Sequence, residues 1–109
     1  VRSKSEMMID SSLYIHKIPF RYEDTLALDD IILYPDFTIR HPKTGEYFYW
    51  EHFGLMDDPV YCKNTFSKLQ LYTTNNIVPD INLITTYETR ERPLSMEKIE
   101  RIITEYFIE

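Results

Sequence analysis

Apolar and polar positions alternate between residues 31 and 53, and this pattern predicts a β-hairpin. In Ile31–Ile39 the odd-numbered positions form one core face, which is typical of a strand buried on one side. Pro35 interrupts that face and indicates a sheet edge or a bulge. His41–Gly45 has turn composition, and the aromatic run Glu46–Phe53 has strong strand character.

Helical spacing predicts a first helix near the amino terminus. Ser3 and Glu6 have the spacing of a capping box, in which each side chain accepts a hydrogen bond from the other residue's backbone N–H. The helix is expected to run to about Lys17, where Ile18-Pro19 ends it. Its inward positions are Ile9, Leu13 and His16.

Two further helices are predicted in the second half of the chain. Asp58-Pro59 is a helix start, and the helix should reach Tyr72 before Asn75-Asn76 ends it. We expect Cys62, Phe66 and Leu69 to form its core stripe. The last helix follows Pro93 and Ser95, with apolar positions at Met96, Ile99, Ile103 and Tyr106.

Two more strands complete the expected fold. Phe20–Glu23 is long enough for a first strand, and the β-branched run Ile81–Tyr87 suits a buried central strand reached by a helical crossover. The resulting order is α-β-β-β-α-β-α. The fold class is therefore α/β (α+β), with a mixed central sheet flanked by helices.

The composition is that of one cored domain. The chain has 109 residues, of which 43% are apolar and 28% charged, and the net charge is −6. Two glycines are too few for a dinucleotide fingerprint or a P-loop. The single cysteine, Cys62, excludes an internal disulfide and a paired-thiolate zinc site, and indicates a reducing compartment.

The patterning favours a cytoplasmic protein without a membrane span. No apolar run approaches the roughly 20 residues that a spanning helix needs. The first residue is Val1 and a helix signal follows it at once, so we expect residues 1–109 to be a single domain that belongs to a longer protein. The acidic balance disfavours an extended phosphate-binding surface.

An acidic pair is expected on the hairpin. With a four-residue loop at 42–45, Asp36 lies opposite Glu51, so that two carboxylates share one face about 5 Å apart. Like charges there destabilise the sheet unless a positive charge lies between them. Oxygen ligands without a histidine cluster suit Mg²⁺ or Mn²⁺. The alternative is a turn contact for Asp36 and a surface ion pair for Glu51. A three-residue turn would separate the two acids.

The spaced acids carry a resemblance to a known family. Tyr34-Pro35-Asp36-Phe37, followed by Tyr49-Trp50-Glu51-His52-Phe53-Gly54, resembles the restriction-endonuclease-like PD-(D/E)XK nuclease superfamily. The similarity extends from the first helix to the strand at residues 81–87. It implies an αβββαβ core with an extra C-terminal helix, and a Mg²⁺- or Mn²⁺-dependent deoxyribonuclease that hydrolyses phosphodiester bonds.

The resemblance assigns roles to individual residues. It implies that the carboxylates of Asp36 and Glu51 and the backbone carbonyl of His52 bind the metal. Glu6 resembles the additional acid that many members place on the first helix, and its capping role remains an alternative. Glu23 is an auxiliary candidate, against the commoner fate of a surface salt bridge.

The sequence departs from the family pattern at the lysine. Phe53 stands where that lysine should lie, two residues after the second acid. Lys68 is a substitute on the next helix, on the stripe Tyr61, Thr65, Lys68 and Tyr72. Lys68 and Tyr72 resemble the Gln-x-x-x-Tyr arrangement of recombination-type members, with Tyr72 as an auxiliary residue. Lys68 as a solvated helix lysine is the alternative.

DNA is the expected partner, and a homodimer and additional domains are further expectations. The candidates for phosphate contacts are Arg2, Lys4, Arg21, Arg40 and Lys43. Two other interpretations stay open. One is a catalytically degenerate module that binds DNA or a protein in a repair or defence protein. The other is a metal-free scaffold whose tyrosines and tryptophan form a partner surface.

Overall fold

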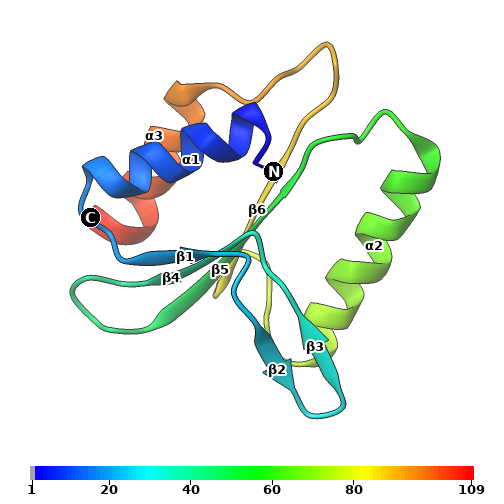
Figure 1. The fold of residues 1–109 in the computed structure, drawn as a ribbon, viewed down its shortest axis with the longest axis horizontal. Helices are drawn as coiled ribbons and strands as arrows, with labels where there is room; N and C mark the ends of the chain where they lie inside the picture. Colours follow the sequence, from blue (N-terminus) through cyan, green and yellow to red (C-terminus); the bar gives the residue numbers. More distant parts are fainter. Residues whose placement is uncertain (1) are drawn as a thin grey trace.

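The computed structural model describes residues 2–109 as a mixed α+β fold with three α-helices and a mixed sheet (Figure 1). Among these residues, none of the helices has the length and apolarity to cross a bilayer. The elements in chain order are α1 (Lys4–Ile15), β1 (Phe20–Tyr22), β2 (Leu26–Leu28), β3 (Ile31–Leu33), β4 (Phe37–Arg40), β5 (Tyr47–Phe53), α2 (Pro59–Thr74), β6 (Leu83–Tyr87), α3 (Met96–Ile103) and the terminal π-helical turn η1 (Thr104–Ile108).

The main sheet has the strand order β1-β4-β5-β6. Strands β1, β4 and β5 are antiparallel neighbours, and β6 joins β5 in parallel after the α2 crossover. In the β4–β5 hairpin Arg40 pairs with Tyr47 and Thr38 with Tyr49, as the four-residue loop predicts. Gly45 in this turn has φ +77°, a conformation that favours glycine.

Helices cover the two faces of the sheet unequally. Helices α1 and α3 lie together on one face (Figure 1), where Phe37, Ile39, Trp50 and Ile84 pack against their apolar residues. Helix α2 lies on the other face, where Tyr72 packs with strand residues. The small β2–β3 hairpin adds Leu26, Leu28 and Leu33 to that second cluster.

The continuous strand expected at residues 31–39 is wrong. The chain leaves regular pairing at Tyr34-Pro35-Asp36, so that β3 and β4 belong to different sheets. Proline has no N–H to offer a ladder, which explains the break at this point. The separated β3 pairs with β2 in a hairpin that the sequence analysis did not predict.

Strand β6 is buried as expected, but its expected central position is wrong. Within residues 2–109 it forms an edge of the four-stranded sheet and has β5 as its strand neighbour. Its apolar composition reflects the two faces instead, because Leu83 packs toward α2 and Ile84 toward α1 and α3.

The expected core stripe of α2 is also wrong. Phe66 is 63% exposed, and Cys62 and Leu69 are half-buried. The helix instead turns Thr65 and Tyr72 to the sheet, and Lys68 lies between them on the same side. This is the stripe on which Lys68 was expected.

The amino terminus of α2 is capped by a single side chain, that of Asp58. The Asp58 carboxylate accepts hydrogen bonds from the N–H groups of Val60 and Tyr61, at 2.9 and 3.2 Å. We expect Asp58→Ala to lower the free energy of unfolding by about 0.5–2 kcal/mol in urea titrations followed by circular dichroism. Asp58→Asn keeps an acceptor and should retain most of the stability. Equal losses in both variants would contradict the capping role.

Candidate active site

The hairpin register brings Asp36 and Glu51 to one face of the sheet. Thr38 pairs with Tyr49 and Phe37 with Trp50, and Asp36, the residue just before β4, lies beside Glu51 in the same pocket. The backbone N–H of His52 donates a 2.7 Å hydrogen bond to Asp36 Oδ2. The Asp36 carboxylate therefore touches the peptide that follows Glu51. The shared face of the two acids is the one that the four-residue loop predicted.

Glu51 is a buried carboxylate with two donors from α2. It is only 2% exposed. Its Oε2 atom accepts a 2.5 Å hydrogen bond from the Tyr72 hydroxyl and lies 2.8 Å from Lys68 Nζ. Burial and then the Glu51 charge raise the pKa of Tyr72, so its hydroxyl remains a proton donor. The structure thus joins the second acid to the predicted lysine and to the predicted auxiliary tyrosine.

Asp36 lies in an environment that disfavours its charged form. Burial, followed by the nearby charge of Glu51, raises the pKa of Asp36 to about 8, against the opposing effect of the His52 N–H. Lys68 lowers this pKa as well, but as a smaller effect. The two acids consequently compete for one positive charge, which is the electrostatic condition that a shared cation relieves.

Two carboxylate oxygens remain available in the pocket between the sheet and α2. In the described part of the chain no hydrogen bond or ion pair reaches Asp36 Oδ1 or Glu51 Oε1. The pocket has a volume of about 250 Å³ and is lined by Glu6, Asp36, Glu51, His52, Phe53, Tyr61, Asn64, Thr65 and Lys68.

Glu6 completes the capping box of α1 and also lines the pocket. Its Oε1 atom accepts hydrogen bonds from the Ser3 N–H at 2.9 Å and from the Tyr22 hydroxyl at 3.2 Å, and the capping box is complete. The same side chain lines the pocket, and its charge contributes to the raised pKa of Asp36. Helix α1 thereby brings a third acid to the edge of the site.

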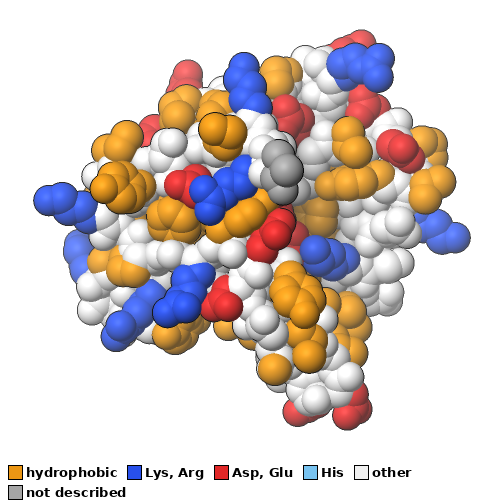
Figure 2. Space-filling view, viewed as in Figure 1, with side chains coloured by type: hydrophobic (Ala, Val, Ile, Leu, Met, Phe, Trp, Pro, Cys, Tyr) orange, Lys and Arg blue, Asp and Glu red, His pale blue; other side chains and the backbone are white. Residues whose placement is uncertain are grey.

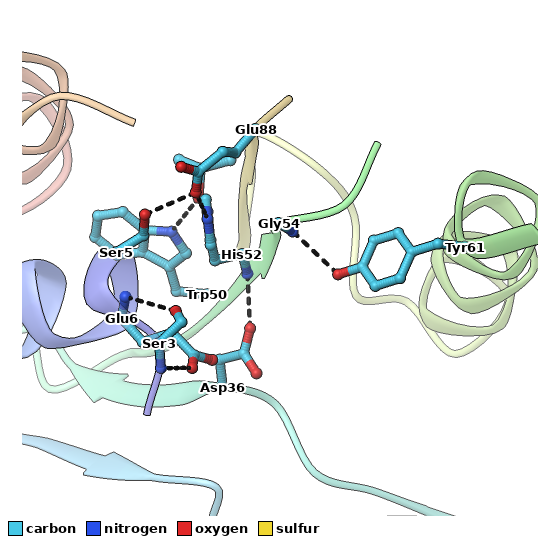
Figure 3. A network of polar contacts seen from close by, with 10 residues as sticks. Ser3, Ser5, Glu6, Asp36, Trp50, His52, Gly54, Tyr61 and Glu88 are labelled. Atoms are coloured by element: carbon cyan, nitrogen blue, oxygen red, sulfur yellow. Dashed lines mark hydrogen bonds and ion pairs between the residues drawn. The ribbon is translucent and has the colours of Figure 1, made fainter. Parts of the chain in front are cut away.

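The His52 side chain lies on the opposite face, in a buried polar network (Figure 3). Its Nε2 atom is 2.7 Å from Glu88 Oε1, which also accepts a hydrogen bond from Ser5 Oγ. Its Nδ1 atom is 2.8 Å from Thr86 Oγ1, which accepts from Trp50 Nε1. A neutral ring with its proton on Nε2 satisfies all these partners. This network ties α1 and the chain after β6 to β5.

Only the backbone of His52 faces the acids. In an extended strand the N–H and C=O of one residue point to the same neighbouring strand. Since the His52 N–H points to Asp36, its carbonyl faces the same side of β5. Two carboxylates and one carbonyl form an oxygen donor set suited to Mg²⁺ or Mn²⁺. A cluster of three or more His, Cys, Asp or Glu side chains arranged for a metal ion is not found within residues 2–109.

Glu23 does not join the pocket. It is exposed at φ +52° just after β1, and its backbone N–H donates to the Asp36 carbonyl at 3.0 Å. The left-handed turn directs the chain away into the β2–β3 hairpin. Glu23 is not among the residues that line the pocket, and its backbone holds the residue that bears the first acid.

The predicted phosphate-contacting cations are not one cluster. Arg2 pairs with Asp10 at 2.5 Å and lies over the Tyr22 ring, while Lys4 lines a groove at the α1 amino terminus. Lys43 Nζ contacts the Ile108 carbonyl at 3.1 Å. Arg21 and Arg40 line a separate depression on the sheet.

The sequence analysis assigned no role to two residues, Tyr61 at the pocket and Glu88 in the polar network on the opposite face. The Tyr61 hydroxyl accepts a 3.0 Å hydrogen bond from the Gly54 N–H and lines the pocket. Tyr61 was on the predicted α2 stripe, which could have identified it. Glu88 follows β6 in an irregular segment, and no periodicity marks it. Trp50 is fully buried, so it takes no part in a partner surface of the kind expected for tyrosines and tryptophan.

We compared the chain with known proteins in three ways. A scan against protein-family models, a search of curated proteins and a search of solved structures each returned no match.

The raised pKa of Asp36 predicts a pH-dependent stability. Between pH 3.8 and about 8 the unfolded chain has released a proton that the folded state retains, so stability falls as the pH rises. We expect Asp36→Asn, which mimics the protonated acid, to raise the free energy of unfolding by about 1–2 kcal/mol at pH 8 in metal-free buffer. The gain should shrink toward pH 4.

Chemical denaturation at several pH values, with a chelator present, measures this difference. Asp30→Asn changes an exposed acid in the β2–β3 turn and serves as the control. A difference between wild type and Asp36→Asn that stays constant with pH would show that Asp36 titrates normally.

Proposed function

We propose that this protein is a metal-dependent nuclease of the PD-(D/E)XK type that hydrolyses DNA phosphodiester bonds. The observation that carries the proposal is the contact of Lys68 with Glu51 at 2.8 Å, beside an Asp36 carboxylate of raised pKa. Two acids and one amine converge in a pocket, as metal-assisted phosphoryl transfer requires.

The topology supports the same assignment. Without the β2–β3 hairpin, the elements α1, β1, β4, β5, α2 and β6 follow the αβββαβ order of the restriction-endonuclease-like core. The parallel β6 reached through α2 also agrees with that core. The β2–β3 hairpin is then an insertion between the first and second core strands.

The metal ligands in this proposal are Asp36, Glu51 and the His52 carbonyl, with Glu6 as an outer acid. When bound, Mg²⁺ or Mn²⁺ supplies Lewis-acid activation of the phosphate and of the attacking water. The two free carboxylate oxygens and the raised pKa of Asp36 support this ligand set, because a cation would replace the missing positive charge.

Lys68 takes the role of the lysine that Phe53 replaces. Its side chain is 35% exposed, so its ammonium group reaches both Glu51 and the open side of the pocket. There it orients the attacking water or stabilises the charge that develops on the phosphoryl oxygens. The Tyr72 hydroxyl donates to the same Glu51 Oε2 atom that Lys68 contacts, and so helps to hold this carboxylate in place.

A second candidate function rests on the same ion pair. Lys68 already supplies one positive charge to Glu51. A degenerate member could retain this pair permanently in place of a metal and serve as a DNA- or protein-binding module. The two candidates differ in whether a divalent cation enters the pocket.

Thermal melting tests the metal site. An ion that binds only the folded state at 100 times its dissociation constant adds about 2.7 kcal/mol of stability. We expect Mn²⁺, and Mg²⁺ more weakly, to raise the melting temperature of wild type relative to a chelator. Asp36→Asn and Glu51→Gln should abolish the rise, and Glu97→Gln on the exposed side of α3 should keep it. Identical wild-type melting in Mn²⁺ and chelator would favour the degenerate module.

Cleavage of plasmid, linear and branched DNA with Mn²⁺ tests the role of Lys68. We expect Lys68→Met to lower the cleavage rate by roughly 10²–10⁴-fold, the range typical of a lost acid–base or charge-stabilising group, while the metal-induced rise in melting temperature persists. Lys63→Met on the exposed side of α2 is the matched control and should cleave like wild type. Activity that survives in each of Asp36→Ala, Glu51→Ala and Lys68→Ala would overturn the assignment.

A further inference from the structure

The sheet face that carries the acid pair is partly free of helix. Helix α2 and the β2–β3 hairpin cover its Tyr49 and Leu83 region. Toward the β4–β5 turn the same face is open, and Arg21 and Tyr47 are 79% and 57% exposed there. A surface depression at this place is lined mainly by Arg21, Asp24, Thr38, Arg40 and Tyr47.

Strand register places these groups in line with the active-site pocket. Arg21 pairs with Thr38, and Arg40 pairs with Tyr47. Because side chains alternate along β4, Asp36, Thr38 and Arg40 point to one face. Arg40 is four residues after Asp36, which corresponds to about 13 Å along an extended strand. This distance equals the length of a few nucleotides of a DNA strand at most.

The depression offers guanidinium groups whose charge the protein itself leaves largely unpaired. Arg40 makes no ion pair within residues 2–109, and the closest acid contact of Arg21 is Asp24 at 3.9 Å, which is weak and solvent-screened. The buried Thr38 hydroxyl has no hydrogen-bond partner among the described residues. Figure 2 shows two Lys or Arg side chains together over the region of β1 and β4, beside one acid.

We propose that this depression binds a backbone phosphate of the DNA strand that is cut at the Asp36–Glu51 pocket. The inference rests on the proposed nuclease function and adds a place where the substrate is held. Two guanidinium groups outweigh the one carboxylate of Asp24, and guanidinium suits the bidentate recognition of phosphate. In a chain of net charge −6, this local excess of positive charge directs the strand to one side of the pocket.

Fluorescence anisotropy of a labelled DNA duplex and of the matching single strand, measured in chelator over a salt series, tests the proposal. We expect Arg21→Gln and Arg40→Gln each to weaken binding roughly three- to tenfold, and to reduce the slope of log affinity against log salt by about 0.9 for the duplex. Arg101→Gln removes an equal charge from α3 and should change neither quantity.

Two results would overturn the inference: no DNA binding by wild type, or variants of Arg21 and Arg40 that bind with the wild-type affinity and salt slope. Parallel melting of all variants with Mn²⁺ separates this failure from that of the nuclease proposal. Normal metal-induced shifts with unchanged DNA binding would reject the phosphate site alone. Weakened DNA binding in the arginine variants without any metal shift in wild type would reject the nuclease and keep the phosphate site.

Discussion

The pairing of β4 with β5 is the interaction on which the site depends. With Phe37 opposite Trp50, two acids on one face meet at the start of β4, where burial and mutual repulsion both disfavour their charges. The apolar residues of the same strands hold this register, since a slip by one residue would turn Phe37 and Trp50 out of the core. The hydrophobic face therefore stabilises an unfavourable arrangement of charges on the other face.

Three groups on two elements, β5 and α2, relieve that repulsion. Strand β5 donates a backbone N–H to Asp36, and α2 donates the Tyr72 hydroxyl and the Lys68 ammonium group to Glu51. These groups offset only part of the repulsion between the two carboxylates, since the pKa of Asp36 remains raised in their presence. Carboxylates with perturbed pKa values cluster at functional sites, and structural ion-pair networks also produce them.

Strand β5 carries buried polar contacts on both of its faces. Opposite the acids, Trp50, Thr86, His52, Glu88 and Ser5 form a chain of hydrogen bonds that joins α1 to the chain after β6. Trp50 and His52 thus point to the network on one face of β5, and Glu51 between them points to the acid pocket on the other face. The buried network fixes the peptide that follows Glu51, and that same peptide holds Asp36.

Local chemistry explains what the sequence by itself determined. The capping box at Ser3, the Asp58 cap and the turn length at residues 42–45 depend on neighbours along the chain, and the loop length placed both acids on one face. Only the tertiary structure decided which face of α2 is buried, where β6 lies, and that Lys68 contacts Glu51. Phe66 is exposed because α2 packs through a polar stripe, and the edge position of β6 depends on pairing between segments remote in sequence. Segments distant in the sequence meet through packing. Hydrophobic periodicity predicts which face of an element is buried, but it does not predict which other element packs against that face.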